Sequence, residues 1–201
     1  MKKFNVEGKE FGMPTSWEEI TLKTYVELEK LESLREVYIQ ELFLLRNIEV
    51  LCSAEQGELD EITIKDVNDL SEASQFLAKQ PEWEMTKHIK IGDVDYAFPQ
   101  DLNQLGMGEY VSMKTLQEGQ ASPADALPYI LAVILRPATL VKDEETGKEN
   151  WVREKLNTTN IEFRKNLFLT MPVFNFMGPI SFFLSGNGTS TTNTKDSIPV
   201  A

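Results

Sequence analysis

The chain has 201 residues, of which 41% are hydrophobic and 26% are charged, as in ordinary globular domains. Its 20 Lys and Arg residues stand against 32 Asp and Glu residues, which gives a net charge of −12. A chain this negative repels phosphates, so we expect no direct nucleic-acid partner and no anionic membrane partner. The single cysteine, Cys52, excludes an intrachain disulfide framework, and the single histidine, His88, leaves little material for a metal site.

No stretch of the sequence approaches 18 consecutive apolar residues, so we expect no transmembrane helix. The N-terminal residues MKKFNVEGKEF carry two lysines without an apolar run behind them, unlike a secretion signal. We therefore expect synthesis in the cytoplasm.

The first residues predict a β-hairpin. Residues 3–6 alternate between polar and apolar, Glu7 and Gly8 supply a turn, and residues 9–11 return. Pro14 ends the second strand, and Thr21 is a good N-cap for the helix that follows.

Helical spacing of apolar residues predicts a second helix over residues 34–52 and a third over residues 64–79. Residues 49–72 are rich in acidic side chains, with Lys65 as the only basic one. They lack the calcium-loop pattern, which needs alternating acids, a central glycine and a terminal glutamate. We expect a solvated connector that leads into the third helix.

A second β-hairpin is expected where residues 87–91 alternate, Gly92 and Asp93 turn, and residues 94–98 alternate back. A helix over residues 107–116 should follow. The next helix begins at Ser122 with a proline in its first turn, and it is apolar nearly all round to Leu135. It is the best candidate for a central buried helix.

The last third of the chain predicts a further hairpin with strands near 139–141 and 151–152 and a charged tip. A helix over residues 159–171 should follow, then an apolar segment from Val173 to Leu184. Residues 186–201 are mostly Gly, Ser, Thr and Asn, which cannot build a core.

An internal repeat appears when the chain is shifted by 85 residues. Both halves then read as a hairpin, a proline break and two helices. The superposed pairs are Phe11 on Tyr96, Pro14 on Pro99, Leu22 on Met107, Tyr25 on Tyr110 and Leu31 on Leu116. Repeated units of this kind serve scaffolding more often than catalysis.

Together these patterns predict a mainly helical α+β protein with two related β-hairpin–helix–helix halves, a further hairpin and C-terminal helices. The expected boundaries are residues 1–80 for the first half, 85–184 for the second half and 185–201 for an extended polar tail.

Candidate catalytic residues are scarce. His88 lies in a predicted strand without a nucleophile or metal motif around it, so we interpret it as an exposed or interface residue. Cys52 closes an apolar helical face and reads as a small core residue. The glycine pairs at 106 and 108 and at 186 and 188 lack phosphate-loop spacing. We expect no catalytic residue, cofactor, metal or small-molecule substrate.

The C-terminal apolar segment is the candidate partner-binding site, because large aromatic side chains dominate interface energetics. The predicted partner-binding residues are Phe174, Phe176, Met177, Phe182 and Phe183. We expect this segment to dock on a neighbouring subunit with the polar tail extended over it.

The stretch PTSWEEITLKTY at residues 14–25, read with IKIGDVDY at 89–96 and with Asp101 and Leu102, resembles small proteins of tailed bacteriophages. These proteins are encoded among head–tail and tail morphogenesis genes, and the resemblance extends loosely over residues 1–184. It implies a non-enzymatic structural subunit of the connector, tail or baseplate, present in the host cytoplasm during assembly and then in the virion.

The partners would be other phage structural proteins in a homo- or hetero-oligomer. The alternative is a tail-assembly chaperone that is absent from the mature virion. The resemblance supplies no functional residues.

Overall fold

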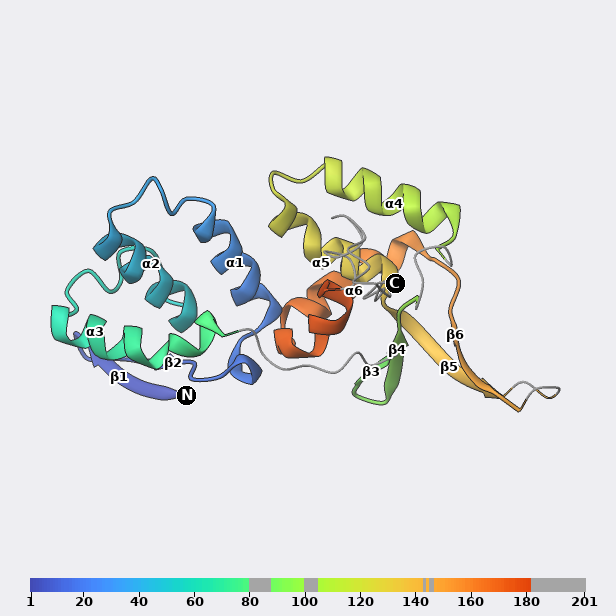
Figure 1. Cartoon of the computed structure of the whole chain (residues 1–201), viewed down its shortest axis with the longest axis horizontal. Coiled ribbons are helices and arrows are strands. Elements are labelled where there is room, and N and C mark those ends of the chain that lie inside the picture. Colours follow the sequence, from blue (N-terminus) through green and yellow to red (C-terminus); the bar gives the residue numbers. More distant parts are fainter. Residues whose placement is uncertain (80–87, 100–104, 143, 145–146, 182–201) are drawn as a thin grey trace, which may run out of the picture.

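The computed structural model describes residues 1–79, 88–99, 105–142, 144 and 147–181. The protein is a mainly helical α+β protein with two antiparallel sheets, as predicted. Along the longest axis, the N-terminal elements occupy one end, α5 and α6 the middle, and the β5–β6 hairpin the other end (Figure 1).

The first hairpin consists of β1 (Lys2–Val6) and β2 (Lys9–Met13), paired antiparallel with Phe4 opposite Phe11. Its two-residue turn places Glu7 at φ 50° and Gly8 at φ 86°. Two consecutive left-handed residues give the turn whose twist matches the flanking strands. The hairpin prediction is confirmed.

Three helices complete the first half: α1 (Leu22–Glu32), α2 (Gln40–Cys52) and α3 (Ile64–Ala73). Thr21 caps α1 by accepting a hydrogen bond from the Thr24 backbone N–H at 3.1 Å. Short 3-10 turns, η1 (Trp17–Glu19) and η2 (Gln75–Ala78), precede α1 and follow α3.

The predicted second helix was too long at its start. Residues 33–39 form the loop between α1 and α2, which lets the two helices pack side by side. Apolar residues continue at helical spacing through this loop, which explains the error.

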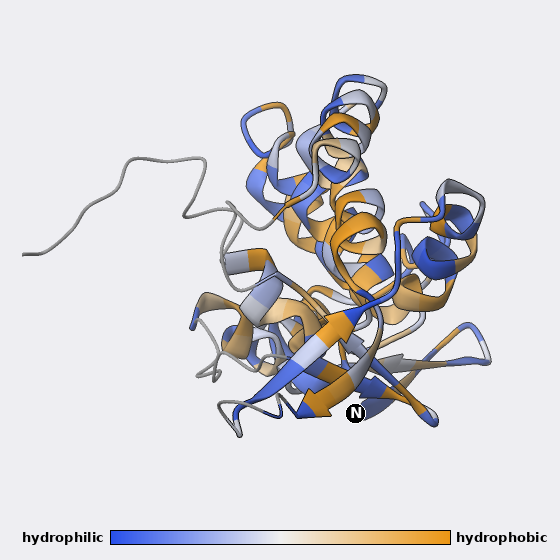
Figure 2. Ribbon diagram, turned by 90° about the vertical axis from the view of Figure 1, so that its right-hand side faces the viewer, coloured by the Kyte–Doolittle hydropathy of each residue, from blue (hydrophilic) through white to orange (hydrophobic). Residues whose placement is uncertain are grey.

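The second half begins with β3 (His88–Ile91) and β4 (Val94–Ala97), followed by α4 (Met107–Glu118) and α5 (Pro123–Ile134). The Ser122 hydroxyl caps α5 by accepting from the Asp125 N–H at 3.1 Å. Leu131 to Ile134 are fully buried, so α5 is the central buried helix that the sequence predicts. Figure 2 shows hydrophobic residues concentrated where the helices pack together.

The remaining elements are β5 (Arg136–Lys142), β6 (Glu149–Arg153), η4 (Thr158–Asn160), α6 (Ile161–Leu169) and η5 (Val173–Phe176). The sheet order is β3-β4-β5-β6. Strand β5 begins three residues before the expected position, because Arg136 and Pro137 pair with the end of β4.

The 85-residue offset recurs in the elements themselves. Helix α1 begins at Leu22 and α4 at Met107, which are 85 residues apart, and in each half a second helix follows a hairpin and a first helix. The surroundings differ, because β4 pairs with β5, whereas β2 has no third strand in the described part of the chain.

The two halves share one hydrophobic core. A short backbone clasp joins them: the Leu22 N–H donates to the Met171 carbonyl at 2.9 Å, and the Val173 N–H donates to the Ile20 carbonyl at 2.7 Å. Helix α1 packs on both α5 and α6. The predicted boundary at residues 80–85 lies outside the described residues.

Candidate interaction surface

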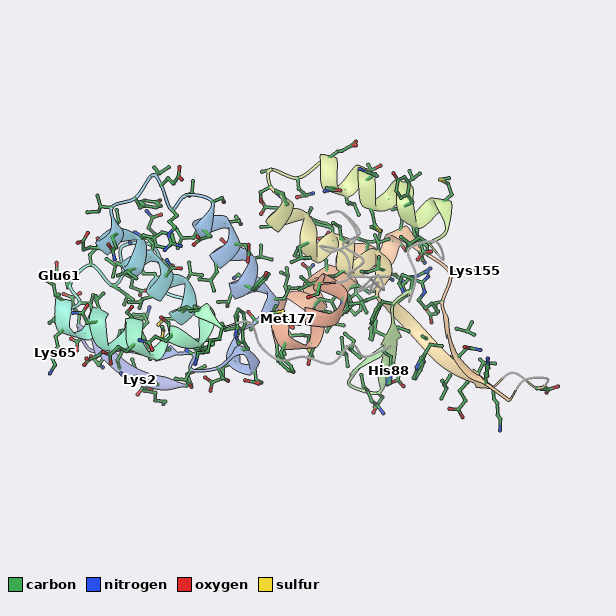
Figure 3. All side chains as sticks on the ribbon, viewed as in Figure 1. Lys2, Glu61, Lys65, His88, Lys155 and Met177 are labelled. Atoms are coloured by element: carbon green, nitrogen blue, oxygen red, sulfur yellow. The ribbon has the colours of Figure 1, made fainter. Side chains whose placement is uncertain are left out.

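The predicted partner-binding segment is mostly part of the protein's own core. Phe176 is fully buried and its ring lies 5.3 Å from that of Phe168, and Met177 is 7% exposed. Figure 3 places Met177 in the middle of the molecule, between α1 and α6. Phe174 is half-buried.

The assignment of Phe176 and Met177 to a partner surface therefore needs correction, because both side chains fill the junction between the halves. Phe182, Phe183 and the polar tail lie outside the described residues. An apolar run in a sequence indicates burial, but it does not say whether the same chain or a neighbour provides the covering surface.

His88 lies on the surface, where its ring stacks on Trp151 at a centroid distance of 4.3 Å. Its Nε2 atom is 3.6 Å from the Asp95 carboxylate. This side chain therefore contributes to packing between β3 and β6. Within the described ranges, no group of three or more His, Cys, Asp or Glu side chains could hold a metal ion.

Cys52 is half-buried, and desolvation raises the pKa of its thiol to about 12. The Sγ atom lies 3.7 Å from the Met13 Sδ atom. A thiol with so high a pKa stays protonated at neutral pH, which makes it a poor nucleophile. Cys52 is thus a packing residue, as the sequence indicates.

Two cavities flank α1. One of about 270 Å³ lies between α1 and the start of α5, where it is closed by Ile180. In it, burial and the neighbouring Glu29 raise the pKa of Tyr25, so that its phenol stays protonated. The other, of about 330 Å³, lies between α1, α2 and the connector that follows α2.

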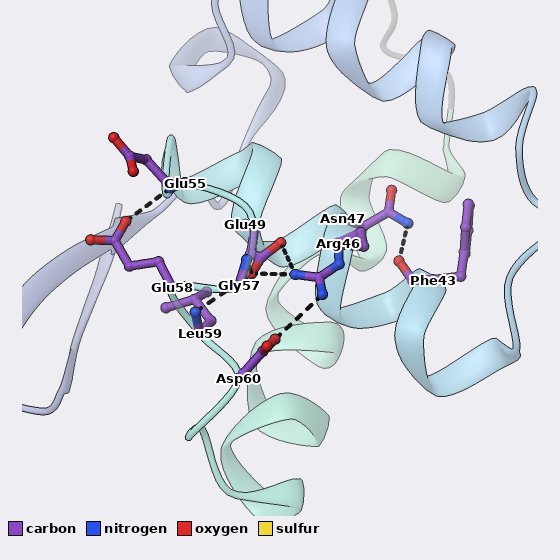
Figure 4. Close-up of polar contacts among 9 residues, drawn as sticks. All are labelled: Phe43, Arg46, Asn47, Glu49, Glu55, Gly57, Glu58, Leu59 and Asp60. Atoms are coloured by element: carbon purple, nitrogen blue, oxygen red, sulfur yellow. Dashed lines mark hydrogen bonds and ion pairs between the residues drawn. The ribbon is translucent and has the colours of Figure 1, made fainter.

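The connector after α2 is held by a buried carboxylate, in contrast to the fully solvated segment that the acidic composition suggests. Glu49 is 3% exposed and accepts hydrogen bonds from Arg46 at 2.6 and 2.7 Å and from the Gly57 N–H at 2.8 Å. Arg46 also reaches Asp60 at 3.4 Å (Figure 4). These bonds fix the connector against α2.

The β5–β6 hairpin projects from the body at one end of the molecule (Figure 1). Only its base is paired with β4, through Arg136 and Pro137. Beyond the base, Leu140, Val141 and Val152 are 45%, 46% and 55% exposed. Exposed β-branched and aliphatic side chains on a projecting hairpin are typical of an interaction surface.

A buried charge cluster anchors the base of this hairpin. The Glu109 carboxylate on α4 pairs with Arg136 on β5, and with Arg153 on β6 at 2.8 Å. Its other oxygen accepts from the Gly106 N–H at 2.8 Å, which closes the first turn of α4. The side chain of Lys155, just beyond β6, also lies near α4 (Figure 3). One carboxylate therefore ties both strands to α4.

Positive charge exceeds negative charge within this cluster. Arg164 on α6 is 4% exposed and donates from Nε to the Ala132 carbonyl at 2.7 Å. Within the part of the chain that the structure describes, Nε of Arg136 and one terminal nitrogen of Arg164 have no hydrogen-bond partner. Burial lowers the pKa of both guanidinium groups, and for Arg136 the neighbouring Arg153 adds to this shift.

Sequence reasoning missed this cluster. The available signal was an arginine, Arg136, directly after the most apolar helix of the chain. Such a position predicts a charge carried into the interior, where a buried partner is required. The sequence does not identify Glu109, 27 residues earlier, as that partner.

A second exposed apolar group lies in the loop between α1 and α2. Leu34, Val37 and Ile39 are 44%, 76% and 69% exposed. The loop is at the opposite end of the molecule from the β5–β6 hairpin (Figure 1). The protein thus presents apolar side chains at two distant sites.

Comparisons with models of protein families, with curated protein sequences and with solved structures find no match for this chain. Among the described residues, no helix is long and apolar enough to cross a membrane.

Proposed function

We propose that this chain is a non-enzymatic structural subunit of a tailed phage particle, in the connector, tail or baseplate, and that it contacts its neighbours through the β5–β6 hairpin. The single observation that carries this proposal is the projecting hairpin, with Leu140, Val141 and Val152 exposed. The phage assignment itself rests on the sequence resemblance.

The anchoring of the hairpin supports this role. Because Glu109 pairs with an arginine on each strand, the base of the hairpin is held in one orientation. A projecting element with a fixed base loses less conformational freedom on binding than a mobile loop. The exposed loop between α1 and α2 supplies a second apolar contact at the other end, as a subunit inside an assembly requires.

The proposed partners are other phage structural proteins, or further copies of the same chain. The polar tail at residues 186–201 would extend over a neighbour, as the sequence predicts. The protein would be present in the host cytoplasm during assembly and then in the virion.

The experiment is quantitative mass spectrometry of purified particles, with an abundant particle protein as the internal standard. A fixed number of copies per particle supports the structural role. Abundance in infected cells combined with absence from particles would refute it and leave the tail-assembly chaperone.

A pair of variants tests the hairpin. Leu140→Asp should reduce incorporation into particles, because a charge replaces an apolar contact. Ile64→Asp is the matched control: Ile64 is 82% exposed at the start of α3, where a negative charge is favourable. Equal incorporation of both variants would separate the hairpin from particle contacts.

A further inference from the structure

The outer edge of β6 is open in the described part of the chain. Strand β6 ends the order β3-β4-β5-β6, so it has a strand neighbour on one side only. An open edge presents unpaired N–H and C=O groups that can pair with another strand.

The register identifies which residues offer these groups. The Glu154 N–H donates to the Pro137 carbonyl at 2.8 Å, which marks a hydrogen-bonded pair between β6 and β5. Hydrogen-bonded and non-bonded pairs alternate along an antiparallel ladder. Val152 and Asn150 therefore bond to β5, whereas the backbones of Glu149, Trp151 and Arg153 face outward.

The sequence of this edge is complementary to itself. In an antiparallel pair centred on Trp151, each Glu149 stands opposite an Arg153 and the two tryptophans stand opposite each other. All three residues belong to the outward-facing set, so hydrogen bonding and charge fit the same register. They also share one face of the strand, which allows side-chain contact between opposite residues.

Two observations on charge favour this arrangement. Glu149 forms no ion pair among the described residues, even though Lys142 stands opposite it in the hairpin. Arg153 belongs to a cluster in which three guanidinium groups share the Glu109 carboxylate. A carboxylate from Glu149 of the partner subunit would lie beside the least neutralised charge in the molecule.

We infer that β6 pairs with β6 of a second copy, antiparallel and centred on Trp151, to form a twofold dimer with one continuous sheet. This pairing also covers Val152, which lies opposite Asn150 of the partner subunit on the other face. The inference goes beyond the proposed function, because the isolated chain should dimerise whether or not it enters a particle.

Cysteine scanning in a Cys52→Ala background tests the register. Trp151→Cys should form an intermolecular disulfide on mild oxidation, because directly opposite Cα atoms are about 5.5 Å apart in a hydrogen-bonded pair. Asn150→Cys is the matched control, since its two copies are offset along the strands beyond disulfide reach. A mixture of Asn150→Cys and Val152→Cys chains should again cross-link.

Sedimentation of the otherwise unmodified chain tests the interface independently, and it does not depend on the folding of the Trp151 variant. Glu149→Arg should raise the dimer dissociation constant at least about tenfold, because two attractive pairs become repulsive. Glu144→Arg, at the exposed tip, should leave the constant unchanged.

The dimer would be refuted by a monomer at concentrations up to about 1 mM. Cross-linking at position 150 as efficient as at position 151 would refute the register. A dimer that is insensitive to Glu149→Arg would contradict the charge pairing on which the inference depends.

Discussion

Replacing Glu109 with glutamine should destabilise the protein strongly, although the change is isosteric. Glu109 is 6% exposed and is the carboxylate shared by Arg136 and Arg153, whose side chains are 6% and 13% exposed. Removing one partner of a buried ion pair costs about 3–5 kcal/mol, because the other charge stays buried without compensation. The glutamine oxygen can still accept one hydrogen bond, so we expect a loss of about 3 kcal/mol in the free energy of unfolding.

Urea unfolding followed by circular dichroism measures this loss, and a thermal scan should show the melting temperature lowered by about 6–12 °C. Glu162→Gln is the matched control. Glu162 also pairs with a cation, Lys165, but it is 60% exposed, so its loss should cost less than about 1 kcal/mol.

A second readout locates the effect. Because Glu109 joins α4 to both strands of the hairpin, Glu109→Gln should accelerate hydrogen exchange in residues 136–153 more than in α1. If Glu109→Gln and Glu162→Gln cost the same, the buried cluster does not anchor the hairpin and the reasoning is wrong.

Three further predictions test the core, the cysteine and a helix cap. Phe176→Ala should cost about 3–5 kcal/mol because Phe176 is fully buried, whereas Phe163→Ala, at 67% exposure, should change stability by less than about 0.5 kcal/mol; comparable losses in urea unfolding would show that the C-terminal segment is not core. The native Cys52 thiol, with its pKa raised to about 12, should react with a thiol reagent at pH 8 far more slowly than after denaturation, and equal rates would contradict its burial. Ser122→Ala should cost about 1 kcal/mol through loss of the α5 cap, with Ser122→Asp retaining most of the stability; an unchanged unfolding curve for Ser122→Ala would count against the cap.

Local signals predicted most elements of the fold. The turn at Glu7 and Gly8, the cap at Thr21 and the proline after Ser122 act within a few residues, so their structural consequences can be read from the sequence. The 85-residue spacing likewise placed α4 where α1 predicts it.

The long-range relations could not be read in this way. Whether Phe176 meets Phe168 or a neighbour depends on how the chain folds back between residues 20–22 and 171–173, and no local pattern encodes that clasp. The pairing of β5 with β4 and the meeting of Glu109 with two distant arginines arise for the same reason.

The central claim is that the β5–β6 hairpin contacts neighbouring subunits in an assembled particle. Its most direct test is cross-linking mass spectrometry on purified particles with a lysine-reactive reagent. Lys142, exposed on β5, should cross-link to another copy or another particle protein at higher yield than Lys65, which lies at the far end of the molecule (Figure 3). Cross-links from Lys142 that stay within its own chain, or particles without the protein, would contradict the account.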